Sequence, residues 1–181
     1  MNEKLRRSYD SEKSPRSITK SFRTGNSRIK KNIQTIVLST VDKDGNPNVS
    51  YAPFVINNGE YQVLISTIAR HARNLTEVPK VSLMLIDDET KSRQIFARRR
   101  LTFDATSRLI EREGEEWESG LKALKARHGD LIDELSKMKD FNLFSFKPTQ
   151  GLFVKGFGKA FEVSSDDLVN IVHLDEGHKT E

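Results

Sequence analysis

The chain has 181 residues, with 30 Lys and Arg against 26 Asp and Glu, and a formal net charge of +4 at pH 7. This length indicates one sizeable core and a single domain. Charged residues make up 31% of the chain and no apolar run approaches the roughly 18 residues that span a bilayer, so we expect no membrane insertion. Cysteine is absent, which excludes disulfides and thiolate ligands and, with no signal-peptide pattern, predicts a cytoplasmic protein.

Residues 1–31 form a basic leader that contains ten Lys and Arg, three Asp and Glu, and six Ser. It has few bulky apolar residues and cannot bury enough surface to offset its ordering entropy, so we expect it to be disordered or loosely helical. We therefore assign the folded domain, including the C-terminal tail, to residues 32–181. No basic surface with interleaved aromatics follows the leader, so we predict no nucleic-acid partner.

Three strands open the predicted domain, at residues 35–41, 48–56 and 61–67. The separators contain Gly45 and Gly59, which tolerate positive φ beside Asn and Asp, and both are typical of hairpin turns. The pattern predicts an antiparallel meander. The first strand is apolar or β-branched on both faces, so we expect it to be covered on both sides, as in an oligomeric barrel.

A short helix at residues 69–78 and a strand at residues 80–86 follow. Residues 94–105 predict the partner strand, with Arg98, Arg99 and Arg100 near its middle. Because side chains alternate between the faces of a strand, at least one arginine points inward if the strand is central. Two interpretations remain open, an edge strand protected by charge and a clamp for an anion.

The second half predicts helices at residues 107–128 and from Asp130, then strands at 141–146 and 151–163. The second helix carries an apolar stripe of Leu131, Ile132, Leu135 and Met138. In the last strand Phe153, Phe157 and Phe161 share a face, with Gly156 and Gly158 opposite. Alternate glycines mark a barrel corner or the close approach of a flat ligand. Ser164 predicts the cap of a final short helix.

About seven antiparallel strands with short inserted helices favour a small barrel, hence a mainly β fold of the α+β type. No nucleophile elbow, P-loop or dinucleotide fingerprint occurs in the sequence. The four histidines form no pair at metal-ligand spacing. Lone histidines, a basic strand and glycine-flanked aromatics suit a flat anionic cofactor better than hydrolysis. From pattern alone, however, His178 is more often a solvated terminal residue than a ligand, His71 more often a capped or exposed helix residue than a catalyst, and Asp140 ordinarily a turn residue at a helix end.

The segments STVDKDGNPNVSYAPFV and ISTIARHARNL resemble the pyridoxamine-phosphate-oxidase-like split barrels. The segments FARRRLTFDA, KDFNLFSFKPTQGLFVKGFGKAF and HLDEGHK resemble the heme-utilisation branch of that superfamily, the HutZ/HugZ heme-degrading proteins. The resemblance covers residues 34–179. It implies a homodimer of FMN-binding-like antiparallel split β-barrels with short flanking helices, holding heme near the dimer interface in place of flavin.

The resemblance also implies roles for six residues. His178 matches the axial ligand of the heme iron, and Thr35 a position that hydrogen-bonds this ligand from the other subunit. His71 and Asp140 match a pair that bonds across the interface. Arg100 and Arg98 match basic residues that contact the cofactor, for which guanidinium groups suit the propionates. We assign Arg100, Asp140 and His71 to the catalytic set.

The function that the resemblance implies is oxidative degradation of heme with release of iron, dependent on dioxygen and a reductant. A heme-delivery protein is a further candidate partner. Two alternatives stay open, a heme storage or transfer protein without turnover and an FMN-dependent oxidoreductase on the same barrel.

Overall fold

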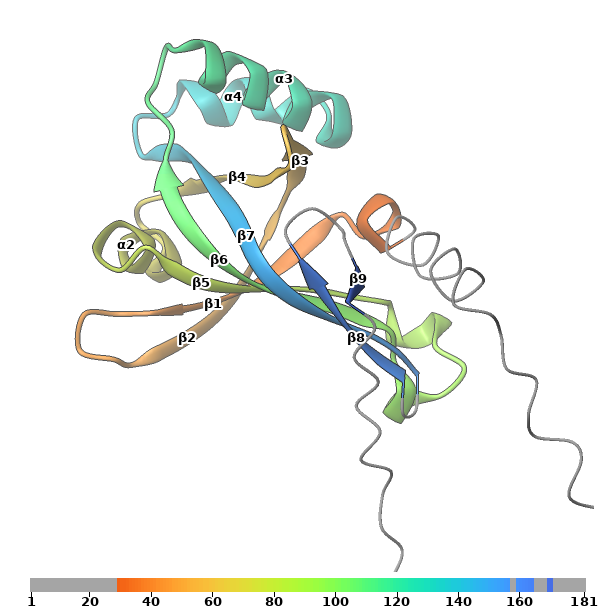
Figure 1. Ribbon diagram of the computed structural model, residues 1–181. Helices are drawn as coiled ribbons and strands as arrows, with labels where there is room; N and C mark the ends of the chain where they lie inside the picture. The colour runs from red at the N-terminus through yellow and green to blue at the C-terminus, as the bar shows by residue number, and fades with distance from the viewer. Residues whose placement is uncertain (1–28, 157–158, 165–168, 171–181) are drawn as a thin grey trace, which may run out of the picture.

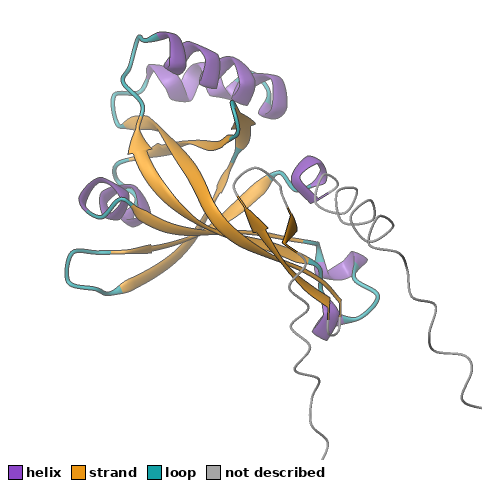
Figure 2. Cartoon of the chain, in the orientation of Figure 1, coloured by secondary structure: helices purple, strands orange, loops and turns teal. Residues whose placement is uncertain are grey.

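The structure is a computed structural model that describes residues 29–156, 159–164 and 169–170 (Figure 1). The strands are β1 (Thr35–Val41), β2 (Pro47–Pro53), β3 (Val55–Asn57), β4 (Glu60–Ser66), β5 (Lys80–Ile86), β6 (Arg100–Leu109), β7 (Phe141–Gly156), β8 (Lys159–Ser164) and β9 (Val169–Asn170). The helices are α2 (Arg70–Glu77), α3 (Glu115–His128) and α4 (Leu131–Lys137), with 3₁₀ turns η1 (Glu89–Lys91) and η2 (Ile95–Ala97). Antiparallel strands dominate (Figure 2), which confirms the predicted fold class.

Both predicted hairpins form. β1 pairs with β2 around Gly45 at φ 84°, and the Asp42 carboxylate accepts the N–H of Asn46 at 2.8 Å inside that turn. β3 pairs with β4 around Gly59 at φ 79°. Glycine adopts this left-handed conformation without steric cost, which is why the separators turn where they do.

The three strands do not form one meander. The sheet order is β2-β1-β5-β6-β7-β4-β3, with β8 on β7 and β9 on β8. β2 and β4 therefore lie near opposite ends of the hydrogen-bonded path, and the sheet curls so that they still contact each other. The chain leaves β2 at Pro53 and buries Phe54 completely before β3 begins. The sequence pattern did not predict that the chain crosses from β2 to the far end of the sheet, because strand pairing between residues distant in the sequence decides where β3 and β4 lie.

The main core fills the concave side of the sheet. Its fully buried large side chains come from β1, β4, β5, β6 and β7 and include Tyr61, Phe144, Phe146 and Phe153. Ile29 belongs to the same cluster with no exposed surface, although it precedes the domain start that we predicted at residue 32. The rest of the predicted leader, residues 1–28, lies outside the described residues.

A second core lies beneath α3 and α4, which cover one end of the convex side over β3, β4 and the start of β7 (Figure 1). Trp117, Leu124, Ile132 and Leu143 are its buried members. The predicted stripe of α4 is half right: Ile132 is buried, whereas Leu131 is 64% exposed and Met138 is 47% exposed. A seven-residue helix has room for little more than one inward position per turn.

Several predicted boundaries are wrong. Residues 94–99 are not a strand, because η2 and the loop around it precede β6. Residues 107–109 continue β6 and are not helical, and α3 begins only at Glu115. β6 lies between β5 and β7, so the interpretation of its arginines as protection of an edge strand is also wrong.

The last strands were also predicted wrongly. Residues 141–156 form the single strand β7, through Lys147 to Gln150, and the chain reverses after Gly156 into β8. Phe153 and Phe161 pair across this hairpin and are buried in the main core. They therefore do not line a ligand site. Val169–Asn170 is the strand β9 where a helix was predicted, and the neighbouring residues 165–168 and 171–181 lie outside the described residues.

Candidate functional site

The convex side of the sheet beyond α3 and α4 has no covering element among the described residues. We call its outward positions on β2, β1, β5, β6 and β7 the open face. They include Val49, Tyr51, Thr35, Val37, Met84, Ile86, Arg100, Thr102, Leu152 and Val154, with the polar Ser39, Ser82 and Asp104 in the next row. Val49 is 71% exposed and Tyr51 is 69% exposed. A contiguous apolar surface of this kind marks a binding site for a ligand or a partner.

The strand register aligns the open face into rows. Tyr51, Val37, Met84, Thr102 and Leu152 pair in succession across β2, β1, β5, β6 and β7. In the next row Ile86 pairs with Arg100 and Arg100 with Val154. Extending the β1–β5 register by two pairs beyond Val37 and Met84 places Thr35 beside Ile86. Thr35 and Arg100 therefore lie on the same face two strands apart, about 10 Å between their backbones.

The structure separates the three arginines. The Arg99 guanidinium makes a two-pronged ion pair with the Asp87 carboxylate, at 2.8 and 3.1 Å. Arg98 donates to the Asp87 carbonyl at 2.5 Å and lies 3.5 Å from the Glu89 carboxylate. Arg100 is half-buried, donates at 3.4 Å to the Arg98 carbonyl, and has no carboxylate partner within the described part of the chain. Of the three arginines, Arg100 is thus the one whose charge is available to bind an anion, whereas Arg98 already contacts the Asp87 carbonyl and the Glu89 carboxylate.

Thr35 is exposed, and the backbone around it is anchored by the end of α3. Arg127 donates to the carbonyl of Ile33 at 2.5 Å and stacks on Phe54, with its guanidinium carbon 4.8 Å from the ring centre. His128 Nε2 lies 2.9 Å from the Phe54 carbonyl oxygen. Because Pro53 pairs with Thr35, these contacts hold both strands where Thr35 begins β1.

His71 and Asp140 lie away from the open face, near the end of β4. Ser66 donates to the Asp140 carboxylate at 2.6 Å, and the Thr67 N–H donates to the Asp140 carbonyl at 2.8 Å. His71 is half-buried in α2, and its Nε2 is buried without a hydrogen-bond partner within residues that the structure describes. Burial lowers the pKa of His71. No hydrogen bond joins His71 to Asp140 within the described chain.

His178 lies outside the described residues, so its predicted role as an iron ligand stays a prediction. In the described ranges no cluster of three or more His, Asp or Glu side chains is arranged to hold a metal ion. Nor does any helix there combine the length and the apolar character needed to cross a membrane.

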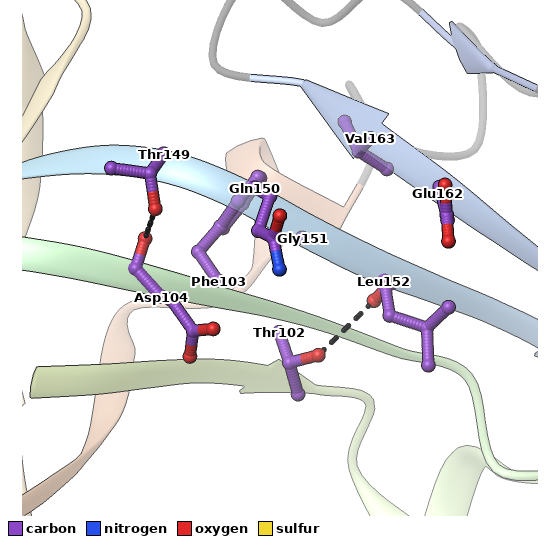
Figure 3. A pocket seen from close by; sticks show the side chains of 9 residues that line it. All are labelled: Thr102, Phe103, Asp104, Thr149, Gln150, Gly151, Leu152, Glu162 and Val163. Carbon is purple, nitrogen blue, oxygen red and sulfur yellow. Dashed lines mark hydrogen bonds between the residues drawn. The ribbon is translucent and has the colours of Figure 1, made fainter.

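A hollow of about 350 Å³ over β6, β7 and β8 adjoins the open face, whose residues Thr102 and Leu152 are part of its lining (Figure 3). A second hollow, of about 410 Å³, shares Asp104 and Thr149 with it. The Thr149 hydroxyl donates to the Asp104 carbonyl at 3.0 Å, and the Thr102 hydroxyl to the Leu152 carbonyl at 3.3 Å. The carboxylates of Asp104 and Glu162 line the first hollow. An anionic group is therefore favoured at the Arg100 row and disfavoured here.

Sequence reasoning missed Asp87 and Arg127. Asp87 stands in the acidic run Asp87-Asp88-Glu89, which by itself indicates only a turn. Arg127 stood among other charged residues near the end of a helix. Neither had a local signal, because their partners are 12 and 94 positions away in the sequence.

The chain is similar in sequence to one protein family and to one of its curated members. The profile of the Pyridoxamine 5′-phosphate oxidase family matches residues 27–155. The chain is 58% identical over 146 residues to the heme oxygenase HutZ of Vibrio cholerae, covering 81% of this chain and 83% of that protein.

Two solved structures share the fold. One is described as HutZ, the heme storage protein from Vibrio cholerae, with a TM-score of 0.72 and 52% identity, covering 76% of this chain and 96% of that chain. The other is Campylobacter jejuni ChuZ, with a TM-score of 0.80 and 25% identity, covering 90% of this chain and 66% of that chain.

Proposed function

Because the chain belongs to the HutZ/HugZ heme-utilisation family of pyridoxamine-5′-phosphate-oxidase-like split β-barrels, we propose that it binds heme and degrades it to release iron. The observation that carries the proposal is the open face, where Thr35 and Arg100 lie on one apolar surface. The expected partners are a second copy of the chain and a heme-delivery protein, and the expected place of action is the cytoplasm, which suits a chain without cysteine.

The residues of the open face fit heme as a substrate. The macrocycle is flat and apolar, and the two rows of paired residues on the open face supply Val37, Met84, Ile86 and Val154 as a broad apolar floor. The propionates are anionic, and Arg100 supplies a fixed positive charge with no carboxylate partner among the described residues. The absence of cysteine excludes a thiolate ligand, and the family resemblance assigns the axial position to His178.

We assign the open face also to the contact with a second copy. Each copy would then bury Val49 and Tyr51, which a lone subunit leaves exposed. Thr35 of one subunit would accept or donate a hydrogen bond at the His178 ring of the other and so orient that ligand. His71, whose ring is only half-buried in the subunit, would bond Asp140 of the second copy.

The heme supplies the redox chemistry, since iron and macrocycle activate dioxygen when an external donor provides electrons. The protein residues bind and orient it. Arg100 would hold the propionates, His178 would bind the iron, and the apolar floor would exclude water from the bound macrocycle. The expected products are iron and a biliverdin-type tetrapyrrole.

A hemin titration followed by ascorbate in air tests the proposal. We expect a complex with one heme per subunit, a Soret band that His178→Ala alters, and bleaching to a biliverdin-like spectrum with release of iron. Arg100→Gln should weaken hemin binding, and Lys137→Gln, an exposed charge on α4, serves as its control.

A second candidate is a heme storage protein, because the HutZ crystal structure is described in those words. Binding without bleaching, in the presence of ascorbate and air, would favour storage. No hemin binding, together with retention of a yellow FMN chromophore, would overturn both and support the flavin alternative.

A further inference from the structure

The loop between β5 and β6 is closed at its base by a single residue, Asp87. Its N–H donates to the Arg99 carbonyl at 3.0 Å, and its carbonyl accepts from the Arg98 guanidinium at 2.5 Å. Its carboxylate receives both prongs of the Arg99 guanidinium. Asp87 therefore contacts the two residues that precede Arg100, through backbone and side chain at once.

We propose that Asp87 is a positioning residue for Arg100, a role that rests on the proposed function of Arg100 as the contact of the heme carboxylates. Arg100 pairs with Ile86, directly beside the Asp87–Arg99 ion pair, so the ion pair fixes where β6 begins. The carbonyl of Arg98, a residue whose side chain donates to Asp87, accepts a hydrogen bond from the Arg100 guanidinium at 3.4 Å. The Arg100 side chain is thereby oriented before an anion arrives.

The ion pair also has the geometry of a strong one. The Asp87 and Arg99 side chains are only 26% and 28% exposed, and the two parallel N–H bonds are bidentate. Bidentate, partly buried pairs of this kind hold a fixed geometry better than single contacts between exposed charges. The Asp87 carboxylate also neutralises the charge of Arg99, so Arg100, not Arg99, is the arginine that can bind an anion.

A charge-balanced pair of substitutions shows whether Asp87 acts by orienting Arg100 or by its own negative charge. The variant Asp87→Asn with Arg99→Gln removes the ion pair and leaves the net charge unchanged. We expect it to weaken hemin binding about two- to tenfold, the effect of an anion contact that must order its own side chain. Asp88→Asn with Lys91→Gln, the matched control in the same loop, should leave the affinity unchanged.

Two further titrations test whether the loss of affinity acts through Arg100 and through the heme carboxylates. In an Arg100→Gln background, the Asp87→Asn with Arg99→Gln pair should cause no additional loss, because the contact that it positions is gone. With hemin dimethyl ester, which lacks the carboxylates, the pair should not change the affinity. An equal loss for hemin and its ester would indicate a general structural defect and overturn the inference.

Three further outcomes separate a failure of the positioning role of Asp87 from a failure of the proposed heme binding. If Asp87→Asn alone tightens hemin binding and the balanced pair has no effect, Asp87 acts by charge and the positioning role is overturned. If Arg100→Gln weakens binding while the balanced pair does not, the inference fails and the heme site stands. If wild type binds no hemin, the proposed function itself fails.

Discussion

At the scale of single residues, His71 shows how burial and partners set the behaviour of a side chain. It lies near the start of α2, half-buried, with Nε2 buried and no partner among the described residues. Burial disfavours the charged imidazolium, so the pKa of His71 lies below its ordinary value of 6.5. In a lone subunit this histidine favours the folded state only while it is neutral.

The prediction concerns the pH dependence of stability. Because the folded pKa of His71 is lowered, the unfolded chain takes up the proton first, and stability falls as the pH drops below about 6.5. In a subunit kept monomeric by Tyr51→Glu, the free energy of unfolding should fall more between about pH 7.5 and about pH 5.5 than in the same chain carrying His71→Gln. Urea unfolding at both pH values measures this, and equal losses would contradict it.

The dimeric protein gives the complementary result. If Asp140 of the second copy bonds His71, the carboxylate favours the protonated ring and raises its pKa. Wild-type dimer should then keep more stability than the His71→Gln dimer as the pH falls through 6.5. The same loss in dimer and monomer would argue against the proposed contact.

At the scale of elements, the two-helix cap on the convex side depends on an arginine outside both helices. Arg112 precedes α3, and its guanidinium carbon lies 4.5 Å from the centre of the Trp117 ring. It donates to the carbonyl of Ser136 near the end of α4 and to that of Phe141 at the start of β7, both at 2.6 Å. One side chain therefore joins the two helices to the sheet.

Loss of this arginine should destabilise the fold. Arg112→Ala removes a stacking contact and leaves partly buried carbonyls unpaired, so we expect about 2 kcal/mol less stability. Arg112→Lys should recover only part of it, because a single ammonium cannot reproduce the planar fork. Lys137→Ala, which breaks an exposed pair with Glu134, is the control and should cost less than about 0.5 kcal/mol. Urea unfolding measures all three, and an Arg112→Ala loss no larger than the control would refute the role.

At the scale of the whole molecule, the open face decides how the subunit is completed. β1 was predicted to be covered on both sides, yet in the subunit only Ile36, Leu38 and Thr40 are buried, while Thr35 and Ser39 are exposed. The subunit's own core thus covers one face of β1, and the other face is left to a second copy or a ligand. A half-barrel with an apolar outer face is incomplete as a monomer.

A charge on the open face should therefore dissociate the dimer. Tyr51→Glu places a carboxylate on a surface that we expect to be desolvated by the second copy, and we expect at least a tenfold weaker association. Leu131→Glu, an equally exposed position on α4 away from the open face, is the matched control. Sedimentation at several concentrations measures both, and a Tyr51→Glu protein that stays as dimeric as wild type would contradict the assignment.

The sequence alone determined what depends on near neighbours. The apolar and β-branched run at residues 35–41 and the alternation at residues 80–86 predicted β1 and β5 with their observed bounds, and the glycine turns predicted the hairpins, because residue type, period and positive φ are local properties. The family resemblance added the residues of a site, of which Thr35 and Arg100 now lie on one face.

Only the tertiary structure decided what depends on distant partners. It placed β6 inside the sheet, joined residues 141–156 into one strand, and buried Phe153 and Phe161 in the core, away from any flat ligand that the glycines beside them allowed. It also singled out Arg100 from its neighbours, through an ion pair between Asp87 and Arg99 that spans a loop. Strand pairing and ion pairing join residues far apart in the chain, and a local pattern carries no information about which partner each one meets.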